Sequence, residues 1–281
     1  MLTRCVSYSA ARWATSIIAP PLLTLVAGIL NVTPDSFSDG GQFRGVEAAV
    51  ARAHAMVAEG ADWIDLGGES TRPGHAAVSE AEELARVVPV IEAFGGTPPV
   101  PLSIDTTKAA VAQAALARGA TIVNDQWGLQ GDAAMADVVA AAGAQVVVMH
   151  NQRGHEYTDI VGDVRAFLER SLAIADRAGI PRTHVIVDPG FGFGKTPAQN
   201  LELLRRLHEL TDLRQRILIG TSRKSMISHV LTGTTPDDRL EGTAATVALG
   251  IAFGASIVRV HDVQAMVRVA RMTDAVLAAG R

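Results

Sequence analysis

Eight short apolar segments recur along the chain, and polar residues follow each of them. Most of the segments are rich in valine and isoleucine, which is typical of parallel strands that are buried on both faces. They predict strands at Leu23–Leu30, Asp62–Leu66, Val100–Ile104, Thr121–Val123, Gln145–Met149, His184–Val187, Arg216–Ile219 and Ser256–Val260.

The segments between the strands carry apolar residues at helical spacing. Over Val46–Val57 these residues fall on one helical face, and Gly60 is expected to cap the end of that helix. Ser79 and Glu82 predict a capping box for the next helix, which Pro89 should kink or end. A further helix should begin at Thr196-Pro197. Others are predicted over Thr107–Gly119, Asp132–Gly143, Val161–Gly179, Arg239–Phe253 and Val263–Ala279.

The strict alternation of strands and helices predicts a parallel α/β sheet. Eight strand–helix units in about 260 residues match the size of a closed (β/α)₈ TIM barrel. An open doubly wound sheet is the alternative, but polar residues cluster after nearly every strand, which favours the barrel. We therefore predict one barrel domain over 23–281, with 1–22 as an N-terminal tail or a cover of the barrel bottom.

Composition and charge narrow the class of protein. The chain has 281 residues, of which 48% are hydrophobic, and a net charge of −4. It shows no basic stripe, so a nucleic-acid partner is not expected. Cys5 is the only cysteine, which excludes a disulfide within the chain and fits the cytoplasm. Residues 1–21 loosely resemble a targeting segment, but no apolar run there is long enough to span a membrane.

The stretch DPGFGFGKT at 188–196 resembles the phosphate-binding loop of nucleotide hydrolases. That pattern requires glycine five positions before Gly194, where this chain has Pro189. In the predicted barrel the stretch becomes a loop on the catalytic face, between the sixth strand and the helix that begins at Thr196-Pro197. Lys195 is expected to be a solvated loop lysine.

Polar side chains at the strand ends provide the candidate chemistry. Carboxylate and amide groups of Asp105, Asn124 and Asp188 could bind a planar ring rich in N–H donors. Cations and backbone amides could bind phosphate, and hard oxygen ligands could bind Mg²⁺ with substrate phosphates. These groups are Arg72, Arg259, His261 and residues 222–225 for phosphate, and Asn31, Asp35 and Asp39 for Mg²⁺.

Each candidate also has a structural interpretation. Asp105 could cap the helix that follows it, and His261 could be a core histidine. Arg223 could pair with a carboxylate for purely structural reasons, and Asn31 could stabilise a turn. The functional interpretation rests on the predicted position of all these residues at one face of the barrel.

Eight motifs of the chain resemble those of one known family. GILNVTPDSFSDGG at 28–41 and DLGGESTRPG at 65–74 closely resemble the first two loop signatures of the dihydropteroate synthases, which are TIM barrels. Six shorter motifs resemble the family in the same order, from about Leu25 to the C-terminus. They are SIDTTK at 103–108, VND at 123–125, VVMH at 147–150, DPGFGFGK at 188–195, GTSRKSMI at 220–227 and IVRVHDV at 257–263.

The resemblance implies an enzyme of folate biosynthesis that joins dihydropterin diphosphate to 4-aminobenzoate and releases diphosphate. It also implies Mg²⁺ with Asn31 as a metal ligand, and Asp105, Lys224, Arg259 and His261 as catalytic residues. The implied substrate-binding set is Thr71, Arg72, Asp105, Asn124, Met149, Asp188, Lys224, Ser225, Arg259, Val260 and His261, with Phe37, Pro73 and Phe193 around the aminobenzoate ring.

The family pattern further implies a homodimer, with 239–253 as a plausible contact, and sensitivity to sulfonamides through Phe37 and Pro73. Two alternatives stay open. One is an aldolase-type lyase with Lys224 as a Schiff base, and the other is a barrel that binds pterin or folate without catalysis. Gln126-Trp127 and Asn151–Asp159 follow no family pattern, so their roles are open.

Overall fold

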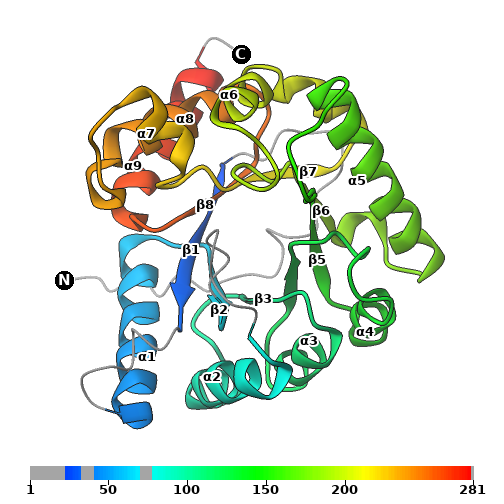
Figure 1. Ribbon diagram of the computed structural model, residues 1–281. Helices are drawn as coiled ribbons and strands as arrows, with labels where there is room; N and C mark the ends of the chain where they lie inside the picture. Colours follow the sequence, from blue (N-terminus) through cyan, green and yellow to red (C-terminus); the bar gives the residue numbers. More distant parts are fainter. Residues whose placement is uncertain (1–22, 33–40, 70–77, 280–281) are drawn as a thin grey trace.

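A computed structural model describes residues 23–32, 41–69 and 78–279, with the side chains of 41–44 left out. Its strands form a closed parallel barrel in chain order, and the helices surround the strands (Figure 1). The strands are β1 (Leu25–Asn31), β2 (Trp63–Gly67), β3 (Leu102–Asp105), β4 (Ile122–Asp125), β5 (Gln145–Met149), β6 (Val185–Asp188), β7 (Arg216–Ile219) and β8 (Ile257–Val260). The predicted barrel is confirmed, and pairing of β1 with β8 excludes an open sheet.

The helices follow the strands as the periodicity predicted, except that α7 was not among the predicted helices. They are α1 (Gly41–Glu59), α2 (Glu80–Ala93), α3 (Ala109–Leu116), α4 (Met135–Ala142), α5 (Ile160–Arg177), α6 (Pro197–Arg205), α7 (Ser225–Val230), α8 (Leu240–Ala252) and α9 (Val263–Ala278). Short 3₁₀ turns lie at η3 (Arg182–His184), η4 (Leu207–Leu213) and η5 (Pro236–Asp238). Both α7 and α8 stand between β7 and β8, so the seventh strand–helix unit carries an additional helix.

Local sequence signals determine where several elements begin and end. Thr196 caps α6 in a reciprocal capping box with Gln199, which confirms the predicted start. Ser79 accepts a hydrogen bond from the backbone N–H of Glu82 at the start of α2, whereas the Glu82 side chain pairs with Arg86. Pro89 was expected to kink or end α2; it does not end the helix, which continues to Ala93.

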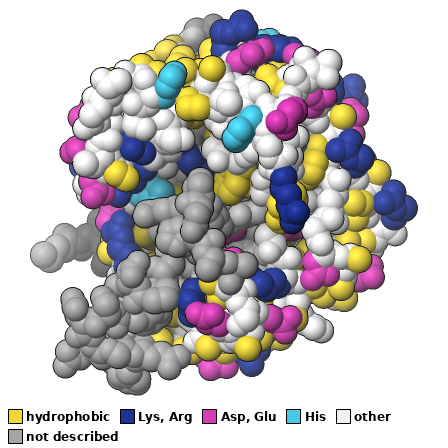
Figure 2. All heavy atoms as spheres, viewed as in Figure 1, with side chains coloured by type: hydrophobic (Ala, Val, Ile, Leu, Met, Phe, Trp, Pro, Cys, Tyr) yellow, Lys and Arg dark blue, Asp and Glu magenta, His cyan; other side chains and the backbone are white. Residues whose placement is uncertain are grey.

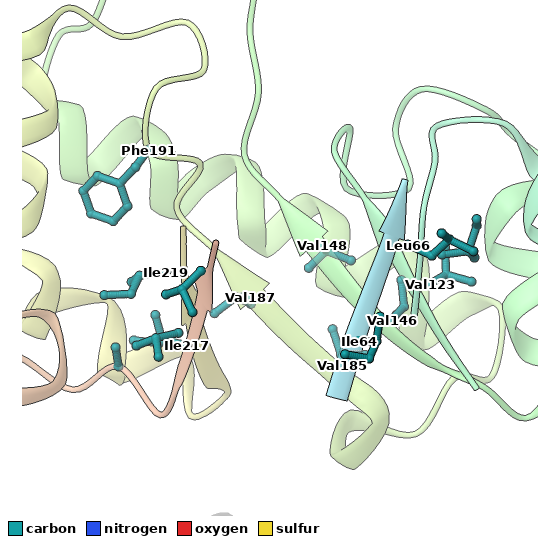
Figure 3. Packing of buried hydrophobic residues seen from close by; sticks show 14 of the residues in the cluster. Ile64, Leu66, Val123, Val146, Val148, Val185, Val187, Phe191, Ile217 and Ile219 are labelled. Carbon is teal, nitrogen blue, oxygen red and sulfur yellow. The ribbon is translucent and has the colours of Figure 1, made fainter. Parts of the chain in front are cut away.

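The two faces of the strands are buried in separate apolar clusters. Side chains that point out of the barrel pack against the helices, and Figure 3 shows Val146, Val148, Val185 and Val187 of this cluster. Side chains on the opposite face form the floor of the barrel interior, which consists of Leu25, Ala27, Trp63, Ile122, Val147, Ile186, Leu218 and Ile257. Burial on both faces explains why the strands read as continuous apolar runs.

The surface of the described residues carries acidic and basic side chains, some of which form ion pairs. On the face in Figure 2, basic and acidic side chains are interspersed around the barrel. Arg206 contacts both Asp159 and Glu202, and such exposed pairs contribute little to stability. Within the described ranges, the helices are too short or too polar to cross a lipid bilayer.

Candidate active site

Strand register brings the predicted site residues to one end of the barrel. Asn31 pairs with Gly67, Gly67 with Asp105, and Asp105 with Asn124 across consecutive strands. Because side chains alternate along a strand, Asp105 and Asn124 face the interior above the apolar floor. The carboxyl ends of β1 to β4 therefore form one wall of polar groups.

A partly buried guanidinium connects two buried carboxylates in this wall. Arg259 of β8 donates to Asp65 through Nε and to Asp105 through Nη2, the latter at 2.7 Å. Asp65 also accepts hydrogen bonds from Ser103 and Asn124. Burial raises the pKa of Asp105, although Arg259 opposes the shift. For Arg259, burial acts to lower the pKa, but the neighbouring carboxylates raise it overall.

Asp105 and Arg259 of this network line one pocket together with the residues above them. Asp105 and Asn124 lie on one side of it, and the remaining lining residues are Gln126, Met149, Asp188, Phe191, Phe193, Gly220, Lys224 and Arg259. Asn124 is 5% exposed and its Oδ1 is buried without a hydrogen-bond partner in the described part of the chain. An unpaired buried acceptor costs free energy until a donor meets it, so this atom is suited to a ligand N–H.

Opposite charges face each other on the second side of the pocket. Asp188 accepts a hydrogen bond from the N–H of Gly190 at 2.7 Å, and burial raises its pKa to about 6. Burial lowers the pKa of Lys224 to about 8, and Arg259 adds to that shift. The Lys224 Nζ lies 4.2 Å from the centroid of the Phe193 ring, which is a cation–π contact. A polar ring could bind between these charges.

The expectation that Lys195 is solvated is wrong. Its side chain is buried, and Nζ lies 2.8 Å from the Gly190 carbonyl oxygen, 3.0 Å from that of Phe193 and 2.9 Å from His150 Nδ1. Gly190 has φ +70°, and a Cβ there would overlap the His150 carbonyl oxygen. The ammonium group thus organises the loop that carries the pocket-lining Phe193.

The segment Asn151–Asp159, whose role the sequence left open, packs on the same loop. The Tyr157 hydroxyl donates to the Gly194 carbonyl oxygen at 2.8 Å. The Asp159 side chain caps α5 by accepting from the N–H of Gly162, and it also pairs with Arg206. This segment therefore supports the pocket from outside.

Several predicted residues lie beside the pocket but do not line it. His261 follows β8, and its Nδ1 is 3.0 Å from Ser222 Oγ. Ser225 is exposed at the start of α7. The side chain of Val260 belongs to the outer apolar cluster, so any contact from Val260 to a pocket ligand would come from its main chain. Asn31 is exposed at the end of β1.

The contacts of Asp105 and Arg223 decide between their structural and functional interpretations. Asp105 does not cap α3, because Lys108 occupies the N-cap position and the Asp105 carboxylate bonds to Arg259 and Gln126. Arg223, in contrast, pairs with Asp262 at 2.7 Å, as its structural interpretation predicted. The predicted Phe37, Thr71, Arg72 and Pro73, and the loop residues Asp35 and Asp39, lie outside the described residues.

The sequence interpretation missed three pocket residues. Phe191 is buried, and Gly220 presents only backbone to the pocket. Gln126 is 8% exposed and donates to Asp105 at 2.7 Å. Strand alternation was the available signal for Gln126, because it lies two residues after the inward-facing Asn124.

The part of the chain with described positions holds no group of three or more acidic, histidine or cysteine side chains that could bind a metal ion. Asn31 Oδ1 lies 3.4 Å from the position that a Cβ of Gly67 would occupy. This carbonyl oxygen is a hard ligand beside the pocket wall. Such a ligand fits Mg²⁺, which often takes only one or two protein ligands together with water and substrate phosphates.

Comparisons with known proteins agree with this geometry. A family model described as pterin binding enzyme matches residues 27–261. The chain is 48% identical to the dihydropteroate synthase of Bacillus subtilis over 257 residues, which cover 92% of this chain and 90% of that protein.

Solved structures give the same result. The dihydropteroate synthase of Clostridium difficile, crystallised in the presence of pteroic acid, matches with a TM-score of 0.88 and 53% identity over 90% of this chain and 97% of that chain. The Xanthomonas albilineans enzyme with 4-aminobenzoic acid matches with a TM-score of 0.87 and 43% identity. The match covers 94% of this chain and 96% of that chain. The chain therefore belongs to the pterin-binding enzyme family and, within it, to the dihydropteroate synthases, which are transferases of folate biosynthesis.

Proposed function

We propose that the pocket at the barrel mouth performs the reaction of this family. In it, 7,8-dihydropterin-6-ylmethyl diphosphate and 4-aminobenzoate give 7,8-dihydropteroate and diphosphate. The observation that carries the proposal is the pocket itself, which brings together Asp105, Asn124, Asp188, Lys224 and Arg259 in a chain of this family.

The pterin ring would lie between the polar wall and Lys224. Asp105 and Asp188 offer carboxylate acceptors, and the buried Oδ1 of Asn124 still needs a donor. Met149 and the phenylalanines of the loop after β6 provide apolar surface for the faces of the ring. Ring N–H donors would meet the acceptors that the protein leaves available, which supports a pterin over a purely apolar ligand.

Bond cleavage separates the methylene carbon from the diphosphate oxygen, and the electron pair leaves with diphosphate. Asp105 in its ionised form would stabilise positive charge on the methylene, and Arg259 and His261 would contact the leaving group. Burial lowers the pKa of His261 to about 3, and Arg259 adds to the shift, so the imidazole is neutral at pH 7. It can therefore donate a hydrogen bond, whereas the positive charge comes from Arg259.

Mg²⁺ would be held by Asn31 together with the substrate diphosphate. When bound, the ion would neutralise negative charge on the leaving group. Ser225, at the start of α7, and Phe193 are proposed to receive the carboxylate and ring of 4-aminobenzoate. The amine then attacks the methylene carbon and loses a proton to solvent or to a nearby base. No protein nucleophile takes part.

Diphosphate release from the purified protein tests the proposal. We expect release with dihydropterin diphosphate and Mg²⁺, coupled to formation of dihydropteroate and dependent on 4-aminobenzoate. Bound pterin without coupled product would favour the non-catalytic barrel. A covalent adduct with a carbonyl substrate, trapped by borohydride and lost in Lys224→Met, would favour the Schiff-base lyase.

The affinity for the pterin ring should be greatest between about pH 6 and pH 8. Asp188 carries its charge above its pKa of about 6, and Lys224 carries its charge below its pKa of about 8, so both are charged only in this interval. Calorimetric titration with 6-hydroxymethyl-7,8-dihydropterin measures this affinity at each pH. This ligand has no phosphate, so no phosphate group titrates in the same pH range. An affinity that stays constant from about pH 5 to pH 9 would contradict the assignment.

Sulfonamides that mimic 4-aminobenzoate should inhibit the enzyme in competition with that substrate. The basis is the family pattern at Phe37 and Pro73, which lie outside the described residues. Initial rates at several concentrations of 4-aminobenzoate and sulfamethoxazole measure the effect, with benzenesulfonamide as the control that lacks the aniline. Undiminished dihydropteroate synthesis in saturating sulfamethoxazole would refute the predicted inhibition.

We also propose a cytoplasmic homodimer. Support comes from large apolar side chains that remain exposed on two adjacent helices, Leu240 and Leu249 on α8 and Met272 and Val276 on α9. Contact with a second copy would remove this surface from water.

A further inference from the structure

Gln126 occupies a position in the pocket that the proposed mechanism does not use. It follows β4 directly, and its side chain is 8% exposed and lines the pocket beside Asp105 and Asn124. Its Nε2 donates a hydrogen bond of 2.7 Å to Asp105 Oδ1. The side chain is therefore held in place rather than free in the pocket.

The two oxygens of the Asp105 carboxylate are held by two different donors. Gln126 binds Oδ1, and Arg259 binds Oδ2 at 2.7 Å. A carboxylate with donors on both oxygens has little freedom to rotate about its χ2 torsion. The direction of the lone pairs that remain for a ligand is thus set by Gln126 and Arg259 together.

The second polar atom of the Gln126 side chain has no hydrogen-bond partner among the described residues. Its amide oxygen Oε1 makes no hydrogen bond to the described residues, and it is not one of the fully buried unpaired atoms, so it remains accessible from the pocket that the residue borders. An unbonded acceptor that borders the pocket is available to a ligand donor. Asn124 leaves its Oδ1 unpaired on the same side of the pocket.

We propose that Gln126 is a positioning residue that directs the Asp105 carboxylate toward the bound substrate, and that its amide oxygen accepts a hydrogen bond from the dihydropterin ring. This inference rests on the proposed function. The charged groups that act on Asp105 are Arg259, Asp65, Glu83 and Lys224. Gln126 adds a donor to this set without adding a charge.

Three variants test the inference by steady-state kinetics and by calorimetric binding of dihydropterin diphosphate. Gln126→Met keeps an unbranched side chain of similar length but has no amide. It should lower kcat/KM for dihydropterin diphosphate by about tenfold to a hundredfold, the effect of losing a hydrogen bond to a charged group. The KM for 4-aminobenzoate should change less than about twofold. Gln113→Met, on the exposed face of α3, is the matched control and should behave as wild type.

Gln126→Glu separates positioning from simple packing. It keeps an acceptor oxygen, but the introduced carboxylate, once ionised, would place a second negative charge against Asp105. Two carboxylates that share one site bind a proton between them at low pH and repel each other at high pH. The loss of kcat/KM relative to wild type should therefore grow as pH rises from about 6 to 9.

The outcomes separate this inference from the proposed function. Wild-type kinetics in folded Gln126→Met would overturn the inference and leave the synthase assignment intact. An equal loss of affinity for both substrates in that variant, with a lowered melting temperature, would show a packing role and would also overturn it. Absence of dihydropteroate synthesis by the wild-type protein would instead overturn the proposed function.

Discussion

The Arg259→Met variant is expected to lose both dihydropteroate synthesis and several kcal/mol of stability. Arg259 contacts two carboxylates that are nearly inaccessible to water, with side-chain exposures of 1% for Asp65 and 6% for Asp105. Removal of one partner from a buried ion pair leaves an uncompensated charge, which costs about 3–5 kcal/mol. Denaturant unfolding and the coupled synthase assay measure the two effects.

A surface arginine supplies the control for this variant. Arg118 forms an ion pair with Glu92 at 2.9 Å, and both side chains are well exposed. Arg118→Met should change the free energy of unfolding by less than about 1 kcal/mol, because exposed pairs contribute little. A similar small change in Arg259→Met would show that the buried network is not maintained by the guanidinium.

A second substitution separates the stability effect from catalysis. In Arg259→Met/Asp65→Asn, one of the two orphaned carboxylates becomes a neutral amide, so part of the lost stability should return. Activity should stay low, because the cation proposed to contact the leaving group is still missing. Arg259→Lys should not restore activity either, since one ammonium cannot reproduce the two directed contacts of the guanidinium.

The fold could be predicted because burial on both faces of a strand leaves a simple signal. Val146, Val147 and Val148 alternate between the helix-facing cluster and the barrel floor, yet all three are apolar. The residues at which strands begin and end leave a weaker signal in the sequence. The first strand begins at Leu25 rather than Leu23, and the N–H of Thr24 donates instead to Asp274 of α9 at 2.8 Å. A contact between residues 250 positions apart leaves no local pattern in the sequence.

The candidate site could be predicted only in part, for reasons that differ between residues. Asp105, Asn124 and Asp188 stand at strand ends, where the barrel topology alone places them at the mouth. Lys195 follows a glycine-rich loop, and its burial depends on carbonyl groups whose directions are set by the folded loop. The predicted loop position suggested a solvated lysine, because loop lysines usually are solvated.

The Asp105→Asn variant isolates the charge of the carboxylate, because asparagine has nearly the same shape. We expect dihydropteroate formation to fall by about 10²–10³, which is typical when a preorganised electrostatic group is removed from a transition state. The buried carboxylate contacts Arg259 at 2.7 Å and Gln126 at 2.7 Å, and an amide oxygen can accept only one of these bonds while its NH₂ group faces the other donor. Some loss of stability should accompany the loss of activity.

Asp65→Asn provides the comparison that decides between direct and indirect action of Asp105. Asp65 binds the same guanidinium but does not line the pocket. If Asp105 acts by facing the reacting methylene, Asp65→Asn should reduce kcat at least tenfold less than Asp105→Asn, although both variants disturb Arg259. Equal losses of kcat in the two variants would mean that Asp105 acts only by holding Arg259. Because both substitutions remove one negative charge and disturb the shared partner Arg259, the difference in kcat reports mainly the position of Asp105 at the mouth of the barrel.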